Sequence, residues 1–315
     1  MPVRGRFAPS PTGQLHLGNA RTALLAWLDA RSAGGAFLMR VEDLDRARAQ
    51  PGAEAQQLAE LAWLGLDWDE GPDRGGPFAP YRQSERTAHY DAAIERLLAS
   101  KRAFLCACSR ADVARAASAP HDDAAAEPRY PGTCRDADPA GVIAQAAAQG
   151  RGPAVRFAGG GQRIDFVDEV HGTVASEAAG VDDFVLRRAD GTAAYQLAVV
   201  VDDAAMEMTR VVRGDDLLRS TPRQIALYRA LELTPPAFAH VPLVLTPGGE
   251  RLAKRTRPAS LASLRASALP PEVVVGALAA SAGLCAPGRA MPAAALVDGF
   301  SLAKIAREPV VVQLS

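Results

Sequence analysis

The chain opens with apolar positions spaced for a strand, then a helix, then a second strand. Residues 5–8 predict a strand, and residues 19–33 predict an amphipathic helix with apolar Ala20, Ala23, Leu24, Trp27 and Leu28. Alternation over residues 37–41 predicts the second strand. This order is typical of the β-α-β unit of a nucleotide-binding fold, where ligands bind at the carboxyl ends of strands. Glu42 and Asp43 follow the second strand and fall at that edge.

Two helices are predicted next, over residues 53–63 and 84–98, and we expect both to cover the sheet. The second has apolar residues at Ala88, Ala92, Ile94, Leu97 and Leu98. The pattern changes between residues 101 and 180, where Ala-, Asp- and Pro-rich stretches and a run of three glycines separate short strands at residues 155–157 and 164–167. This segment is predicted to be an inserted subdomain.

The nucleotide-binding pattern then resumes. The continuous apolar run over residues 197–201 predicts a buried parallel strand, followed by a strand over residues 208–212. A helix with Thr221 as N-cap and Pro222 in its first turn comes next, and another is predicted over residues 271–282. The predicted fold class is α/β, with two halves of a Rossmann-like domain at residues 1–105 and 186–256, an insertion at 106–185 and a short helical C-terminal region at 257–315.

Composition limits the class of protein. A chain of 315 residues is long enough for about two domains, and 48% hydrophobic and 23% charged residues are typical of a globular protein. No apolar stretch approaches a membrane span and no secretory signal opens the chain, so we expect a cytoplasmic protein without membrane contact. The net charge of −1 means that nucleic acid would need a local patch, for which the candidate is Arg251, Lys254, Arg255 and Arg257. A solvated charged loop is the alternative.

Two short segments far apart in the chain together predict an ATP site. The first, RFAPSPTGQLHLGN, runs from Arg6 to Asn19 and places a Pro- and Gly-containing turn directly before the first helix. Backbone N–H groups and the positive dipole end at a helix N-terminus suit a polyphosphate. The second, RLAKR, runs from Arg251 to Arg255 and supplies flexible cations that can neutralise charge on a leaving pyrophosphate.

These two segments resemble the HIGH and KMSKS elements of class I aminoacyl-tRNA synthetases, and the first has the glutamyl-tRNA synthetase form. Three further segments continue the resemblance in the same order, VEDLD at residues 41–45, AYQLAVVVDD at 194–203 and VRGDDL at 212–217. Ala253 stands where the second motif usually has Ser, and Asn19 stands where the first often ends in His. The resemblance implies a Rossmann-like class I aminoacyl-tRNA synthetase catalytic domain, a ligase.

The length of the chain favours one branch of that family. Glutamyl-tRNA synthetases carry a helical anticodon-binding region after the second motif, whereas about sixty residues follow Arg255. The chain therefore resembles the truncated glutamyl-queuosine tRNA(Asp) synthetase family. This implies tRNA-independent activation of L-glutamate by ATP and transfer of glutamate to the queuosine base at the wobble position of tRNA(Asp), and we expect a monomer. The alternatives are a short glutamyl-tRNA synthetase that charges an acceptor end and a catalytically silent paralogue that binds glutamate or tRNA.

Three of the four cysteines gather in the predicted insertion, as Cys106, Cys108 and Cys134. Thiols of a cytoplasmic protein stay reduced, so zinc ligation is favoured over a disulfide, with small buried cysteines as the alternative. By its chemistry His121 is the first candidate for a fourth ligand and His171 the second. The family resemblance instead implies Tyr130, which completes a C-x-C…Y-x3-C pattern around one structural zinc ion per chain.

Glutamate has two carboxylates and an ammonium group, so its site needs guanidinium groups, a carboxylate and hydroxyls. Arg6 and Arg213 are the implied partners of the carboxylates, and Glu42 is the implied partner of the α-ammonium. Taken singly, Glu42 could equally be a surface charge and Tyr195 a half-buried aromatic. The whole pocket implied by the resemblance consists of Arg6, Phe7, Ala8, Pro9, Ser10, Glu42, Tyr195 and Arg213.

The same resemblance implies an ATP site built from Pro9, Gly13, His16, Gly18, Asn19, Arg251 and Lys254. In adenylate formation a carboxylate oxygen attacks the α-phosphate and pyrophosphate leaves, with Mg²⁺ bridging phosphate oxygens. Alignment and charge stabilisation dominate such a reaction. His16 and Lys254, the implied catalytic residues, are therefore expected to stabilise charge and not to transfer protons.

Overall fold

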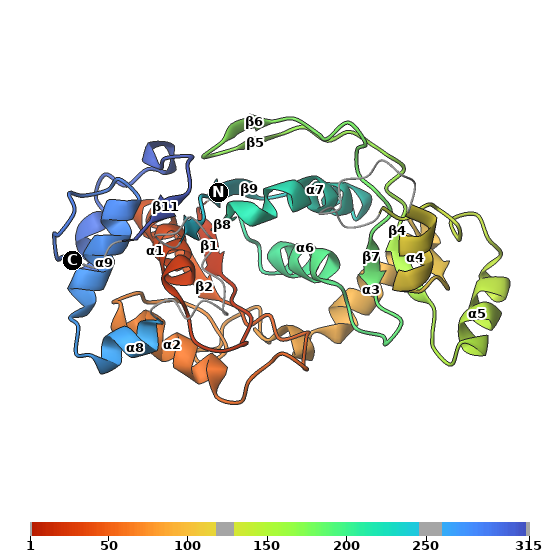
Figure 1. The fold of residues 1–315 in the computed structure, drawn as a ribbon, viewed down its shortest axis with the longest axis horizontal. Helices are drawn as coiled ribbons and strands as arrows, with labels where there is room; N and C mark the ends of the chain where they lie inside the picture. Colours follow the sequence, from red (N-terminus) through yellow and green to blue (C-terminus); the bar gives the residue numbers. More distant parts are fainter. Residues whose placement is uncertain (1, 118–128, 246–259, 313–315) are drawn as a thin grey trace.

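The computed structural model describes residues 2–117, 129–245 and 260–312. The molecule is elongated (Figure 1). The C-terminal helices lie at one end, the parallel strands lie next to them, and the predicted insertion lies at the other end. Within the described residues, no helix combines the length and the apolar character needed to cross a membrane.

Parallel strands form the centre of the catalytic part. β1 (Arg4–Phe7) pairs in parallel with β2 (Ala36–Met39), and α1 (Leu17–Ser32) connects them, which confirms the predicted β-α-β unit. β8 (Arg210–Gly214) pairs in parallel with β9 (Ala237–Val241). β8 also lies against β1, because the Thr209 N–H donates to the Arg4 carbonyl oxygen at 3.1 Å. The carboxyl ends of these strands face one edge, which is where ligands bind in open α/β sheets.

Helices cover this sheet. α1 is buried along most of its length between the strands and α9 (Pro271–Ser281), because apolar side chains face both. α2 (Ala53–Trp63) and α3 (Thr87–Ala99) confirm two predicted helices. The predicted buried face of α3 is partly wrong, since Ala88 and Ala92 are exposed and the buried positions are Tyr90, Ala93, Ile94 and Leu97. That face follows from the contact of α3 with α6 (Tyr195–Ala205).

The strand predicted over residues 197–201 is wrong, because these residues belong to α6. All positions from Leu197 to Asp203 are buried, so the helix is enclosed on every side along this run. A short continuous apolar run does not distinguish a buried helix from a buried strand. The strand predicted over residues 208–212 is confirmed as β8.

The predicted insertion contains a separate antiparallel sheet. β3 (Ala103–Cys106) pairs with β4 (Ala154–Phe157), and β4 pairs with β7 (Val185–Arg187). α4 (Arg110–Ala117) and α5 (Pro139–Ala148) belong to the same region. The insertion has a hydrophobic core of its own, separate from the core of the catalytic part, and this core includes the three cysteines.

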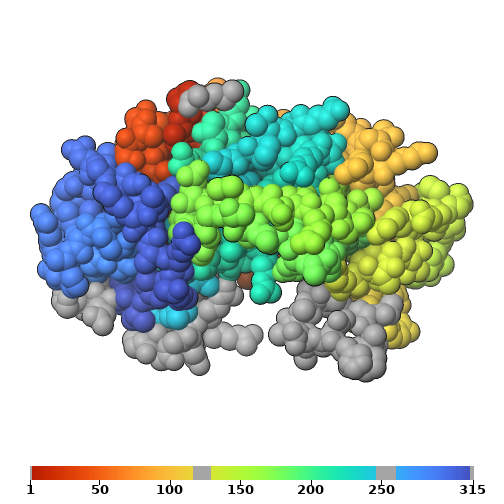
Figure 2. All heavy atoms as spheres, turned by 90° about the horizontal axis from the view of Figure 1, so that it is seen from above, coloured from red at the N-terminus to blue at the C-terminus, as the bar shows by residue number. Residues whose placement is uncertain are grey.

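A hairpin links this region to the catalytic sheet. β5 (Phe166–Asp168) pairs with β6 (Gly172–Val174) and also in parallel with β9, where Asp168 lies opposite Phe238. In Figure 2 the green segment that contains the hairpin crosses the face of the molecule towards the blue C-terminal region. A strand predicted for the insertion therefore joins the catalytic sheet, and the predicted boundary near residue 185 stays a prediction.

α7 (Thr221–Ala230) begins after Ser220, so the predicted N-cap at Thr221 is one residue too late. Thr221 is the first helical residue, and its hydroxyl faces β8 and β9. Pro222 occupies the first turn as predicted. The remaining elements are β10 (Val244–Leu245), α8 (Leu261–Ala266), β11 (Val310–Val311) and the 3-10 helices η1 (Gln83–Glu85), η2 (Asp215–Ser220), η4 (Ala293–Leu296) and η5 (Leu302–Lys304).

Candidate active site

The turn before α1 is closed by a reciprocal pair of hydrogen bonds. The Asn19 N–H donates to His16 Nδ1 at 3.2 Å, and the His16 N–H donates to Asn19 Oδ1 at 3.4 Å. His16 is the N-cap of α1, which begins two residues before the predicted start at residue 19, and Asn19 is its capping partner. A Cβ on Gly18 would lie 3.0 Å from the His16 ring, so glycine permits the ring to lie over the turn. The arrangement fixes His16 beside a helix N-terminus suited to phosphate.

The described residues that flank the second motif lie beside this turn. Ser260 forms an antiparallel bridge with His16. Val244 lies 3.7 Å from the place of a Cβ on Gly18. The following residues lie outside the described part of the chain, so their roles stay predictions: Arg251, Ala253, Lys254, Arg255, Arg257 and His121.

A hydrogen-bonded loop leads from β1 to the His16 turn. Nε2 of Gln57 on α2 donates to the Ser10 carbonyl oxygen at 3.1 Å and to the Gly13 carbonyl oxygen at 2.7 Å. Gly13 has a φ of 124°, which other residues rarely adopt. The loop is therefore held by α2 and requires glycine at residue 13.

Four predicted pocket residues begin the same loop: Phe7, Ala8, Pro9 and Ser10. The Phe7 side chain packs in the core, while its carbonyl oxygen accepts the Arg40 N–H at 3.1 Å. The Pro9 carbonyl oxygen accepts the Glu42 N–H at 3.0 Å. The Ser10 side chain is exposed. Phe7 and Pro9 thus act through their backbone, which holds the strand of Arg40 and Glu42 beside β1.

Two predicted pocket residues, Arg6 and Glu42, are joined by groups that the sequence alone did not single out. Arg6 donates to both oxygens of Asp203, at 3.1 and 3.2 Å. Arg40 donates to Asp203 Oδ1 at 2.6 Å and to Glu42 Oε1 at 3.2 Å. Burial raises the pKa of Glu42, whereas the charges of Arg40 and Arg6 oppose that rise. Asp203 therefore fixes the guanidinium groups of both Arg6 and Arg40.

Tyr195 and Arg213 complete the cluster. Burial raises the pKa of Tyr195, the charge of Arg213 lowers it, and that of Glu42 raises it, so these groups are electrostatic neighbours. Burial lowers the pKa of Arg213. The structure therefore brings Arg6, Glu42, Tyr195 and Arg213 close together, from β1, the end of β2, α6 and β8, while their role in binding glutamate stays a prediction.

Sequence reasoning missed Arg40, Asp203, Thr221 and His240. Asp203 stands at the end of an otherwise apolar run, which could have indicated a buried ion pair. Arg213 donates from Nε to His240 Nε2 at 3.0 Å and from Nη2 to Thr221 Oγ1 at 2.9 Å. Its Nη1 is buried and has no hydrogen-bond partner.

The three cysteines of the insertion meet as predicted. Their sulfur atoms lie within 4.8 Å of one another, and Cys108 Sγ is 3.6 Å from Cys134 Sγ. Tetrahedral coordination at a Zn–S distance of about 2.3 Å requires sulfurs about 3.8 Å apart, so the spacing fits zinc. The Tyr130 hydroxyl lies 3.4 Å from Cys106 Sγ and 3.7 Å from Cys108 Sγ. His171 is distant in the fold, on the β5–β6 turn against Asp168.

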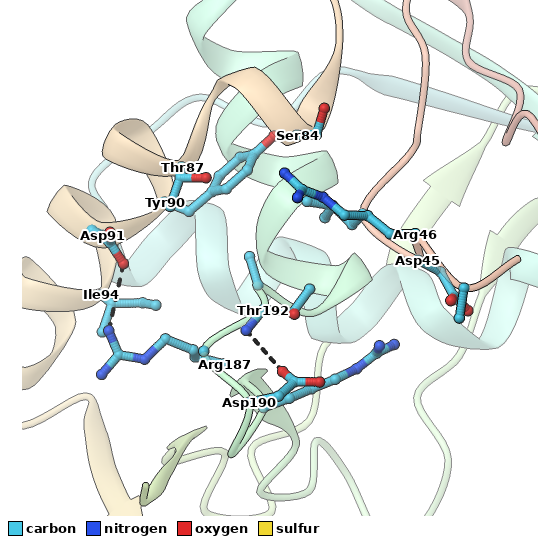
Figure 3. Close-up of a pocket in the computed structure, with 15 residues that line it drawn as sticks. Asp45, Arg46, Ser84, Thr87, Tyr90, Asp91, Ile94, Arg187, Asp190 and Thr192 are labelled. Carbon is cyan, nitrogen blue, oxygen red and sulfur yellow. Dashed lines mark hydrogen bonds and ion pairs between the residues drawn. The ribbon is translucent and has the colours of Figure 1, made fainter. Parts of the chain in front are cut away.

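The structure contains two neighbouring cavities, which share Arg188 and Asp190 among their lining residues. One of about 950 Å³ extends from Cys108 and Tyr130 to Tyr195 and is lined by five arginines, Arg110, Arg151, Arg156, Arg188 and Arg223. The other, of about 460 Å³, lies between α3 and the loop after β7 (Figure 3). In Figure 3 Arg187 faces Asp91, at 3.4 Å, and Asp190 accepts the Thr192 N–H. Charges of both signs line both cavities, but in the larger one the five arginines outnumber the aspartates, which are Asp182, Asp183 and Asp190.

The chain matches the family described as tRNA synthetases class I (E and Q), catalytic domain, over residues 2–284. A glutamyl-Q tRNA(Asp) synthetase from Symbiobacterium thermophilum is 54% identical over 97% of this chain and 94% of its own length. One from Nocardia farcinica is 50% identical over 97% of this chain and 91% of its own length. Glutamate--tRNA ligase 1 of Halorhodospira halophila is 43% identical over 98% of this chain, which spans 65% of that protein.

A solved structure has the same fold. It is that of a glutamate tRNA ligase from Elizabethkingia meningosepticum in complex with its amino acid, with a TM-score of 0.86 and 30% identity over 100% of this chain and 68% of that one. The predicted α/β catalytic domain is confirmed. The chain belongs to the class I (E and Q) tRNA synthetase family, in the branch of the glutamyl-Q tRNA(Asp) synthetases.

Proposed function

We propose that this protein activates L-glutamate with ATP and transfers it to queuosine at the wobble position of tRNA(Asp). The support is its high identity to proteins named glutamyl-Q tRNA(Asp) synthetase over nearly their whole length. Identity to the proteins named glutamate--tRNA ligase is lower, 42–45%. The reaction makes it an aminoacyl-tRNA synthetase-type ligase, which we expect to act as a cytoplasmic monomer.

One observation carries the glutamate assignment: the buried Nη1 of Arg213 has a proton to donate and no acceptor. Leaving a buried charged donor unpaired costs free energy, so a ligand carboxylate is the natural acceptor. Arg6 supplies a second guanidinium and Glu42 a carboxylate for the α-ammonium. Tyr195 borders both and contributes its hydroxyl.

Adenylate formation follows from this arrangement and the His16 turn. The α-carboxylate oxygen of glutamate attacks the α-phosphorus of ATP, which enters as its Mg²⁺ complex, and pyrophosphate leaves. Backbone N–H groups at the start of α1 and the His16 side chain stabilise phosphate charge. Pro9, Gly13, Gly18 and Asn19 shape that turn. Arg251 and Lys254 remain our proposed partners of the leaving pyrophosphate.

The cysteine cluster is proposed to hold one structural zinc ion through Cys106, Cys108, Tyr130 and Cys134. Three thiols and a hydroxyl make a closed four-ligand set, which leaves no position for substrate. A neighbouring arginine supports the set, since Arg156 Nε donates to Cys106 Sγ at 3.3 Å and its guanidinium lies 4.0 Å from the Tyr130 ring centre. The ion would stabilise the insertion and take no part in the reaction.

The arginine-lined cavity is our proposed entrance for the accepting nucleotide. It reaches Tyr195, and therefore the glutamate pocket, from the surface of the insertion. Guanidinium groups bind phosphate and stack on bases. A queuosine hydroxyl placed there would attack the adenylate carbonyl carbon, release AMP and form the glutamyl ester.

The test is transfer of labelled glutamate in the presence of ATP to three substrates. These are tRNA(Asp) with queuosine, the same tRNA with unmodified guanosine, and tRNA(Glu). We expect label only on the first. Equal labelling of both forms of tRNA(Asp), or label on the terminal adenosine of tRNA(Glu), would favour the glutamyl-tRNA synthetase alternative, and no glutamate-dependent exchange of pyrophosphate into ATP would favour the silent paralogue.

A further inference from the structure

A buried chain of hydrogen bonds ends on the arginine of the glutamate pocket. Arg213 on β8 and His240 on β9 are paired residues of neighbouring parallel strands. His240 Nδ1 lies 2.6 Å from Asp168 Oδ2, and His240 Nε2 lies 3.0 Å from Arg213 Nε. The imidazole is fully buried, and Asp168 is 1% exposed. The chain Asp168–His240–Arg213 therefore crosses three adjacent strands, β5, β9 and β8.

The partners of His240 determine its protonation. Arg213 Nε carries a hydrogen and can only donate, so His240 Nε2 must accept and carries no hydrogen. Nδ1 then carries the single proton of a neutral imidazole and donates to the Asp168 carboxylate. Asp168 is itself fixed by backbone N–H groups of Val170, His171 and His240. The imidazole ring consequently has one orientation, with its acceptor aimed at Arg213.

The guanidinium of Arg213 is held on three sides. His240 accepts from Nε, Thr221 accepts from Nη2 at 2.9 Å, and the Phe238 ring lies beneath it, 5.2 Å from the guanidinium carbon to the ring centre. Only Nη1 is left without a partner. A side chain with several rotatable bonds is thus locked with one donor left unpaired, and the loss of freedom on binding a carboxylate is small.

We propose that His240 is a positioning residue for glutamate recognition, which through Asp168 and Arg213 presents Nη1 of Arg213 to a carboxylate of the substrate. The inference rests on the proposed function, because Arg213 must first be a glutamate ligand. The β5–β6 hairpin, through Asp168, then also contributes to the affinity for glutamate. In this role His240 acts through Arg213 and is not itself a ligand of glutamate.

Two substitutions separate positioning from packing, because each preserves one of the two hydrogen bonds that join the His240 side chain to Asp168 and to Arg213. His240→Asn places an amide N–H near Nδ1, so it still donates to Asp168 but does not reach Arg213. The glutamine of His240→Gln is longer, so its amide oxygen reaches Arg213 Nε, while Asp168 loses the side-chain donor that His240 Nδ1 provides. The readouts are glutamate KM and kcat in pyrophosphate exchange at saturating ATP, and thermal unfolding.

The positioning role predicts that His240→Asn and His240→Gln rank in opposite order for glutamate KM and for stability. His240→Asn should raise glutamate KM about tenfold, the effect of losing one hydrogen bond to a charged group, and His240→Gln should raise it less than about threefold. The stability should rank the other way, since in His240→Gln the buried Asp168 carboxylate loses its side-chain donor and keeps only backbone N–H donors. The KM for ATP should stay at the wild-type value in both. Glutamate KM values that simply follow stability would overturn the proposal.

His171→Asn is the matched control. Only the backbone N–H of His171 bonds to Asp168, at 2.9 Å, so its side chain can be replaced without breaking the hydrogen bonds that link Asp168, His240 and Arg213. Its glutamate KM should be unchanged. If neither His240 variant folds, Thr221→Val replaces the Nη2 acceptor with a side chain of the same shape, and an unchanged glutamate KM there would overturn the proposal.

Failure of this inference is distinguishable from failure of the proposed function. Wild-type exchange that does not depend on glutamate would remove the proposed function and this inference with it. Glutamate-dependent wild-type exchange, with equal KM values in His240→Asn and His240→Gln, would remove only the role of His240.

Discussion

Arg6 and Asp203 lie 197 residues apart in the chain and form a two-point ion pair, with nitrogen–oxygen distances of 3.1 and 3.2 Å. The same carboxylate accepts from Arg40 at 2.6 Å. Asp203 thus balances two buried guanidinium groups and ties α6 to β1 and β2. The Asp203 carboxylate therefore contributes both to the stability of the catalytic sheet and to the geometry of the proposed glutamate pocket.

Replacement of Asp203 by Asn should lower the free energy of unfolding by about 3 kcal/mol, because buried Arg6 loses its paired carboxylate and buried Arg40 loses one of its carboxylate partners. Glutamate affinity should fall as well, since Arg6 loses its orientation. Urea unfolding measures the first effect and titration of glutamate in the exchange reaction the second. Asp91→Asn is the control: its pair with Arg187 is partly exposed, so the expected change is below about 1 kcal/mol. Equal effects of the two substitutions would contradict the role of Asp203.

Gly18→Ala should slow pyrophosphate exchange with little effect on stability. The added methyl would lie 3.0 Å from two atoms of the His16 ring, one of them the Nδ1 that accepts from the Asn19 N–H, so the ring must shift by a few tenths of an ångström and this hydrogen bond is expected to weaken. We expect a loss of about tenfold or more in kcat, because the reaction depends on alignment. Gly141→Ala on α5 is the matched control, since its nearest neighbour would be 3.7 Å away. Unchanged kcat in Gly18→Ala would show that His16 is not needed where it lies.

Zinc content tests the cysteine cluster. We expect about one zinc ion per chain in the wild type, a loss of zinc and a lower melting temperature in Cys134→Ser, and wild-type zinc in Cys285→Ser, which lies outside the cluster. Tyr130→Phe tests the fourth ligand, because it removes only the hydroxyl. Reduced zinc affinity is expected there, and full affinity would return His121 to first place among the candidates.

Stability should depend on pH through His240. Burial lowers its pKa from the ordinary value of 6.5 and the charge of Arg213 lowers it further, while the bond to Asp168 opposes the shift. The unfolded chain therefore takes up this proton at a higher pH than the folded one. The resulting stability is present above the unfolded pKa and is lost as the pH falls below about 6.5.

The difference in free energy of unfolding between the wild type and His240→Gln should accordingly shrink between about pH 8 and pH 5. Charged or titratable groups facing His240 are Asp168, Arg213 and His171, and all three remain in the variant. The pKa of Asp168 is lowered from 3.8, so its own contribution falls outside this range. A difference that stays constant or grows on acidification would show that His240 is not buried in its neutral form.

Short-range features followed from the sequence alone. The β-α-β unit, the position of His16 at a helix N-terminus, and the helices over residues 53–63 and 271–281 are set by periodicity and turn residues that lie next to one another in the chain. Family motifs, being ordered in sequence, also identified Arg6, Glu42, Tyr195 and Arg213, and the structure brings these four residues together.

Tertiary structure decided what depends on partners far apart in the chain. Residues 197–201 are helical because the fold surrounds α6 with apolar groups, a circumstance that a continuous apolar run does not encode. Asp168, Asp203 and His240 gain their roles only where β5, α6 and β9 meet the strands of the two arginines. Sequence determined which charged groups the pocket contains, whereas the packing of distant elements fixed their direction, because a buried charge takes its orientation from the partners that the fold supplies.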